Sequence, residues 1–84
     1  MSAPYPTGEL PMVGDLIDLN HGRSVLAKVL VVVGGSTEGA APGQSVESCR
    51  ECGPGVLVQI QGPGGGALVF EEPNDDTILV QRAV

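Results

Sequence analysis

The sequence feature that most constrains the fold is an apolar run of nine residues, VLAKVLVVV, at positions 25–33. Side chains branched at Cβ favour an extended strand over a helix, and valine makes up most of this run. A half-exposed strand alternates between apolar and polar residues, so a run interrupted only by Lys28 predicts a strand covered on both faces. We therefore expect residues 25–33 to form the central strand, with the other segments packed around it.

The chain of 84 residues has room for one hydrophobic core. Its 13 glycines and seven prolines predict many turns and little helix. Three of the prolines fall within residues 1–12, which we expect to form an extended arm. Tyr5 in this arm either pins it to the domain, which we favour, or contacts a partner. A single small domain then covers residues 13–84.

Apolar segments separated by turn residues predict five short β-strands, with helix limited to one turn near Pro73. The expected strands cover residues 13–19, 24–33, 56–61, 67–71 and 77–82. Alternation predicts inward-facing side chains on the last three strands, namely Val56, Val58, Ile60, Leu68, Phe70, Ile78 and Val80. Asp15 and Asp18 are typical of an edge or half-exposed first strand. The predicted fold class is all-β.

The longest stretch without strand character is the glycine-rich segment 34–54, in which Val46 is the only large apolar residue. Long connections in small domains often carry function. We expect this segment to be an irregular loop that docks on a partner.

Strict alternation along the central strand gives two apolar rows. One row holds Val25, Ala27, Val29, Val31 and Val33, and the other holds Leu26, Leu30 and Val32. A small barrel has one interior, so one row should face outward and be covered by a partner. We expect Val32 in that outward row, and we favour a second copy of the chain, a homodimer, as its cover.

The step Gly14-Asp15-Leu16-Ile17, followed by Ala27-Lys28-Val29, resembles the opening hairpin of Tudor-like and KOW-like barrels. The order of strands, long loop, tight hairpin and final strand is similar to that of SH3-like barrels. The resemblance implies a small five-stranded barrel. Those modules recognise methyl-lysine or proline-rich peptides with clustered aromatic side chains, and this chain has one Tyr and one Phe. We therefore do not expect their ligands here.

Ten acidic and four basic residues give a formal net charge of −6. Nucleic acids and anionic membranes attract clustered lysine and arginine, whereas the basic residues here are scattered singly. We expect neither as a partner, and another protein instead. The sequence shows no export signal and no apolar run of membrane-spanning length, and its two cysteines fit reduced thiols. We therefore expect a cytoplasmic location.

Two cysteines three positions apart, Cys49 and Cys52, resemble one knuckle of a zinc ribbon. Zinc prefers four ligands, and His21 is the only further nitrogen or sulfur donor. A complete site would need a carboxylate such as Glu47 or Glu51, or a second subunit. A plain reduced pair is the favoured interpretation, with a bound metal and a disulfide or redox role as alternatives.

No catalytic motif is present, so we expect no enzyme activity. The leading hypothesis is a non-enzymatic acidic interaction module, an accessory, inhibitor or phage-type protein. It would dock through the 34–54 loop and an exposed apolar strand face, with contacts at Tyr5, Val32, Val46, Arg50 and Glu51. The alternative is a zinc-binding structural or metal-handling protein that uses Cys49, Cys52 and His21.

Overall fold

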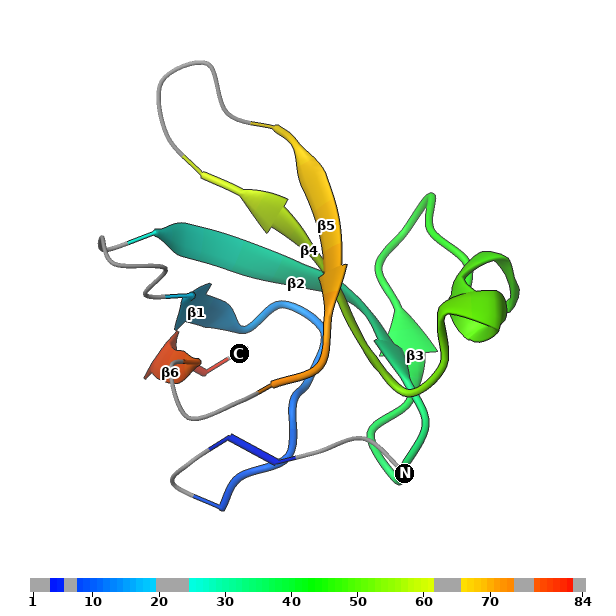
Figure 1. The fold of residues 1–84 in the computed structure, drawn as a ribbon, viewed down its shortest axis with the longest axis horizontal. Helices are drawn as coiled ribbons and strands as arrows, with labels where there is room; N and C mark the ends of the chain where they lie inside the picture. The colour runs from blue at the N-terminus through cyan, green and yellow to red at the C-terminus, as the bar shows by residue number, and fades with distance from the viewer. Residues whose placement is uncertain (1–3, 6–7, 20–24, 62–65, 74–76, 83–84) are drawn as a thin grey trace.

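The computed structural model describes residues 4–5, 8–19, 25–61, 66–73 and 77–82, and these form an all-β structure with one short 3₁₀ helix (Figure 1). In chain order the elements are β1 (Leu16–Asp18), β2 (Leu26–Val33), β3 (Gly39–Ala40), η1 (Glu47–Cys52), β4 (Gly55–Ile60), β5 (Leu68–Glu71) and β6 (Ile78–Gln81). The described residues include no helix long and apolar enough to cross a membrane.

In the described chain, six strands form one open antiparallel sheet in the order β5-β4-β2-β1-β6, and β3 pairs with β2 beside this path. The prediction of five strands is one too few, because β3 lies inside the segment expected to be irregular. The all-β class is confirmed. The turn predicted near Pro73, at residues 72–75, includes residues 74 and 75, which lie outside the described residues.

Strand β2 is the centre of the sheet, as its composition predicts. It pairs with β4 along most of its length, with β1 over its first half and with β3 over its second half. Both of its edges are therefore paired. Both of its faces are covered only in its second half, because Leu26 and Lys28 in the first half are exposed, so the prediction of a strand covered on both faces holds for residues 31–33 alone. β1 lies between β2 and β6, so the alternative of an edge strand for β1 is wrong, although Leu16 and Asp18 are half-buried.

A β-bulge at Leu30 divides β2 into two halves. Val29 pairs with Val58 and Val31 pairs with Leu57, so two steps along β2 match one step along β4. The extra residue reverses the alternation of faces beyond it. The predicted rows are therefore wrong, and Val32 lies on the same face as Val29.

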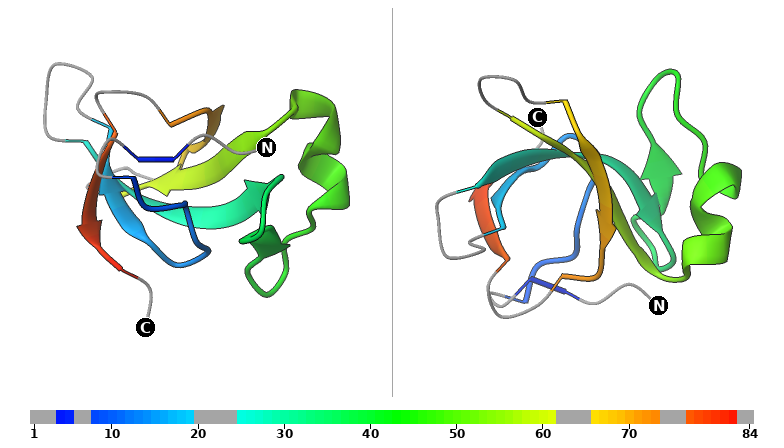
Figure 2. Two further views of the ribbon diagram at one scale, coloured as in Figure 1. Left: turned by 90° about the horizontal axis from the view of Figure 1, so that it is seen from below. Right: turned by 45° about the horizontal axis from the view of Figure 1, so that its top comes forward.

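The main core lies on the face of β2 that carries Val29 and Val32. Its buried members come from the N-terminal segment and from β1, β2, β4 and their flanks: Tyr5, Ile17, Leu19, Ala27, Val29, Val32, Val56 and Val58. The sheet curls around this core, and the dark-blue N-terminal segment lies between β6 and β5 in both views (Figure 2). The core is thus closed partly by strands and partly by the N-terminal segment.

The predicted facing of β4 is confirmed, whereas that of the outer strands is wrong. Val56 and Val58 are buried, but Leu68, Ile78 and Val80 are 53%, 49% and 53% exposed. Leu79 pairs with Ile17 and is partly buried against the main core, whereas Val69 pairs with Val58 but is 36% exposed. Phe70 lies on the opposite face of β5 from Val69 and is half-buried.

Candidate functional site

The segment 34–54, predicted to be an irregular loop, is folded. It contains β3 and η1, and η1 packs over the face of β2 opposite the main core (Figure 1). A second cluster lies between them, with Val31, Val33 and Cys49 buried and with Leu30, Val46, Leu57 and Phe70 partly buried against it. The bulge at Leu30 creates this cluster, because it turns Val31 and Val33 toward η1.

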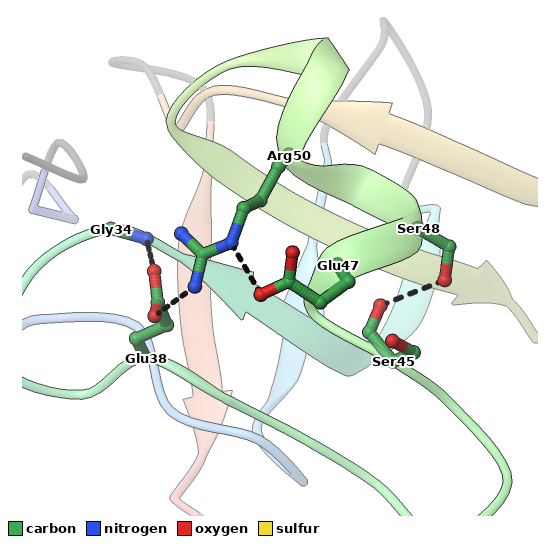
Figure 3. A network of polar contacts seen from close by, with 6 residues as sticks. All are labelled: Gly34, Glu38, Ser45, Glu47, Ser48 and Arg50. Carbon is green, nitrogen blue, oxygen red and sulfur yellow. Dashed lines mark hydrogen bonds and ion pairs between the residues drawn. The ribbon is translucent and has the colours of Figure 1, made fainter.

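The helix η1 is held at its start by bonds within the chain. The Cys49 amide donates to the Val46 carbonyl at 3.0 Å, and the Ser48 hydroxyl donates to the Ser45 carbonyl at 3.0 Å (Figure 3). Val46, a predicted partner contact, is half-buried and packs against the second cluster. The part of Val46 that packs inward therefore stabilises the fold.

Arg50 connects η1 to the chain that follows β2. Its Nε donates to Glu47 Oε1 at 2.8 Å, and its Nη2 donates to Glu38 Oε1 at 3.1 Å (Figure 3). The other oxygen of Glu38 accepts the Gly34 amide at 2.7 Å. We call these four residues the Arg50 clamp. Exposed ion pairs add little stability, so the main effect of the clamp is to fix the direction of the side chains.

The clamp shifts the protonation equilibria of its members. The pKa of Glu38 is lowered, chiefly by the hydrogen bond from the Gly34 amide and then by the positive charge of Arg50. The pKa of Arg50 is raised, chiefly by its hydrogen bond to Glu47. Both groups are therefore charged at neutral pH, and two carboxylates around one guanidinium leave the clamp with a net negative charge.

A shallow pocket of about 220 Å³ opens beside the clamp. It is lined by Val33, Gly34, Glu38, Arg50, Gly53 and Pro54. Val33 and Pro54 supply an apolar surface, while Glu38 and Arg50 supply charge at the rim. Glu51, another predicted contact, is exposed on the same helix. The pocket is smaller and more open than the enclosed sites in which small molecules usually bind.

The two cysteines lie on η1 as free thiols. Cys49 is 8% exposed and belongs to the second cluster, and Cys52 is exposed at the end of the helix. Within the described residues, no three His, Cys, Asp or Glu side chains gather closely enough to hold a metal ion. His21, the proposed third ligand, lies outside the described residues.

Tyr5 and Val32 are not available to a partner. They are 1% and 0% exposed and belong to the main core, so their assignment as partner contacts is wrong. The preferred interpretation of Tyr5, pinning of the arm, is confirmed. Its hydroxyl donates to Asp15 Oδ2 at 2.8 Å.

Asp15 is the buried polar centre that the sequence analysis missed. Its side chain is fully buried, and Oδ2 also accepts the Met12 amide at 2.9 Å. Arg82 Nη1 lies 3.6 Å from the same oxygen, and Arg82 Nη2 donates to the Leu10 carbonyl at 2.9 Å. Burial and the bond to Asp15 hold the pKa of Tyr5 well above its usual range. The N-terminal segment is therefore bound both to Asp15, just before β1, and to Arg82, just after β6.

No family model matches the sequence, and comparison with curated proteins and with solved structures found no similar protein. The structure itself brings five of the predicted site residues together on η1 and at its start: Val46, Cys49, Arg50, Glu51 and Cys52. We call the surface formed by these residues the face around η1.

Proposed function

We propose that the protein is a non-enzymatic acidic interaction module that docks on another protein through the face around η1. The observation that carries the proposal is that 34–54, the longest connection between predicted strands, is ordered by its own cluster and by the Arg50 clamp. The segment nevertheless presents charged side chains to solvent. An ordered projection of this kind loses little conformational entropy on binding.

The charge of this face indicates the partner. The side chain of Glu47 is 78% exposed, that of Arg50 is 49% exposed, and Glu51 is exposed beside them. With a net charge of −6 over the whole chain, the protein would be steered toward a basic surface. Neither a nucleic acid nor an anionic membrane fits this charge.

The fold that we propose for the module is an SH3-like barrel. The strands β1, β2, β4 and β5 follow one another across the sheet, and β6 returns to pair with β1. This order brings the last strand back beside the first, as closure of a small barrel requires. We place the module in the cytoplasm as an accessory, inhibitor or phage-type protein.

A second surface of the module is the outward face of β2, β1 and β6. Leu26, Asp18 and Ile78 form a cross-strand row there, and Leu26 and Ile78 are 39% and 49% exposed. We propose that this row is the homodimer face. Light scattering of the wild type should show a dimer, and Ile78→Asp should give a folded monomer. A wild-type monomer at high concentration would contradict it.

The docking proposal is tested with the full chain as bait in a lysate of its own cells. The double variant Arg50→Ala/Glu51→Ala removes charge from the proposed face, and Glu72→Ala removes an exposed charge outside the 34–54 segment. A partner held by the wild type and by Glu72→Ala but lost by the double variant is expected. Equal capture by all three proteins would overturn the assignment of the face.

The zinc alternative requires a ligand that the described residues do not supply to Cys49 and Cys52. Metal analysis of the reduced protein decides it. Zinc at one ion per chain, or one per two chains, would establish the alternative, and loss of that zinc in Cys52→Ser would place the metal at η1.

A further inference from the structure

The geometry of η1 points to a reversible disulfide between Cys49 and Cys52. Residues three apart in a 3₁₀ helix lie on the same side, one turn and about 6 Å apart along the axis. Both cysteines belong to η1 and are three residues apart. Disulfides join Cα atoms that are roughly 4.4–6.8 Å apart. We infer that these thiols form a dithiol–disulfide pair within one helix, whether or not the face around η1 docks on a partner.

The two thiols differ in exposure, and this difference determines which of them reacts first. Cys52 is exposed and therefore reacts with the oxidant first. Cys49 is 8% exposed, and its side chain packs in the second cluster. The oxidant is a low-molecular-weight disulfide such as oxidised glutathione. The Cys52 thiol loses a proton to water, and its sulfur attacks the glutathione disulfide. This step forms a mixed disulfide and releases one glutathione.

Cys49 then resolves the mixed disulfide. Its thiol loses a proton, its sulfur attacks the sulfur of Cys52, and a second glutathione leaves. In total, two protein thiols are oxidised to one disulfide while one glutathione disulfide is reduced to two thiols. A reducing thiol reverses both steps.

The product would close the last turn of η1. At present the Gly53 amide donates to the Arg50 carbonyl at 3.1 Å across this turn. A covalent bond from Cys49 to Cys52 spans Arg50 and Glu51 and removes open conformations of the turn. Oxidation would therefore slow the exchange of the amide hydrogens at the end of η1 without changing the sheet.

The test incubates the purified full chain with oxidised glutathione, without denaturant and with a metal chelator. Remaining thiols are alkylated, and the products are identified by mass spectrometry. The expected wild-type product has no disulfide between chains, lacks two hydrogen atoms per chain and takes up no alkylating agent. Cys49→Ser should instead stop at the mixed disulfide on Cys52, and Cys52→Ser should remain reduced.

Three results would overturn the proposal. The wild type could stop at the same mixed disulfide as Cys49→Ser, or it could form only disulfides between chains, or both thiols could stay reduced. Hydrogen exchange gives a second measurement. The amides of residues 49–53 should exchange more slowly after oxidation and return to the first rate on reduction, whereas unchanged rates would contradict the closed turn.

Discussion

The main core and the second cluster are built on the two faces of one strand, β2, but they are closed by different kinds of contact. The main core is closed by strand pairs that are distant in sequence and by a buried hydrogen-bond centre at Asp15. The second cluster is covered by a six-residue helix, η1, which packs on it through Cys49 and Val46 and is joined to the chain after β2 by the exposed ion pair of Arg50 and Glu38. Buried, long-range contacts resist opening more than exposed local ones.

The main core and the second cluster should therefore contribute differently to stability. The main core should set the global stability, because its members Val29, Val32 and Val58 are fully buried. The second cluster should open at a lower free energy, since its cover has few buried contacts. A helix end that changes on oxidation is best placed over the weaker cluster.

The largest expected effect comes from removing the centre of the main core. Asp15→Ala leaves the Tyr5 hydroxyl and the Met12 amide without their common acceptor, and it removes the carboxylate that lies 3.6 Å from Arg82 Nη1. We expect a loss of about 3–5 kcal/mol in the free energy of unfolding, measured by urea denaturation. Asp18→Ala is the control, because this carboxylate is only half-buried and its bond from the Val25 amide is longer, at 3.2 Å. Equal losses in the two variants would contradict the central role of Asp15.

A smaller effect is expected where β4 passes β5. Gly55 has φ of +152°, and a Cβ there would lie 2.7 Å from the Glu71 carbonyl oxygen and 2.9 Å from Phe70 Cε1. Gly55→Ala should cost about 1–3 kcal/mol of stability. Gly43→Ala is the matched control, because Gly43 also has positive φ but nothing within 4 Å. The loss at Gly55 should exceed that at Gly43 in urea denaturation, and similar losses would leave backbone strain as the sole cause.

The raised pKa of Tyr5 makes the main core sensitive to alkaline pH. Below about pH 10 the phenol is neutral in the folded and unfolded chain, so its contribution to stability is complete. Above that pH only the unfolded chain ionises, and stability should fall by about 1.4 kcal/mol per pH unit until the folded pKa is reached. Urea denaturation between about pH 9 and about pH 12 should show constant stability up to about pH 10 and this slope above it in the wild type. Tyr5→Phe should lack it, and identical slopes would contradict the prediction.

The smallest effect on global stability is expected at the Arg50 clamp. Arg50→Ala breaks two exposed ion pairs, so the urea midpoint should change less than in any variant above. Hydrogen exchange at residues 49–53 should nevertheless become faster, because η1 loses its connection to Glu38. Lys28→Ala, which removes an exposed charge from β2, should leave that exchange unchanged. Unchanged exchange in Arg50→Ala would remove the distinction between the two clusters.

The sequence contained more information about η1 than the prediction used. Residues 44–52 are the longest part of the 34–54 segment without glycine or proline, and Glu47 and Arg50 are spaced to pair on one helix face. The abundance of glycine around them favoured an irregular loop. The burial of Cys49 had no comparable local signal, since it depends on Val31 and Val33 turning toward η1.

The sequence by itself determined the all-β class, the central position of β2 and the inward face of β4. These features follow from Cβ branching and from alternation, which act over neighbouring residues. Only the tertiary structure decided the bulge at Leu30, the exposure of Ile78 and the complete burial of Asp15. Each of these depends on the register of a strand pair, or on polar partners, that come from distant parts of the chain. One inserted residue in a strand pair reverses every side chain beyond it, and no local pattern encodes that shift.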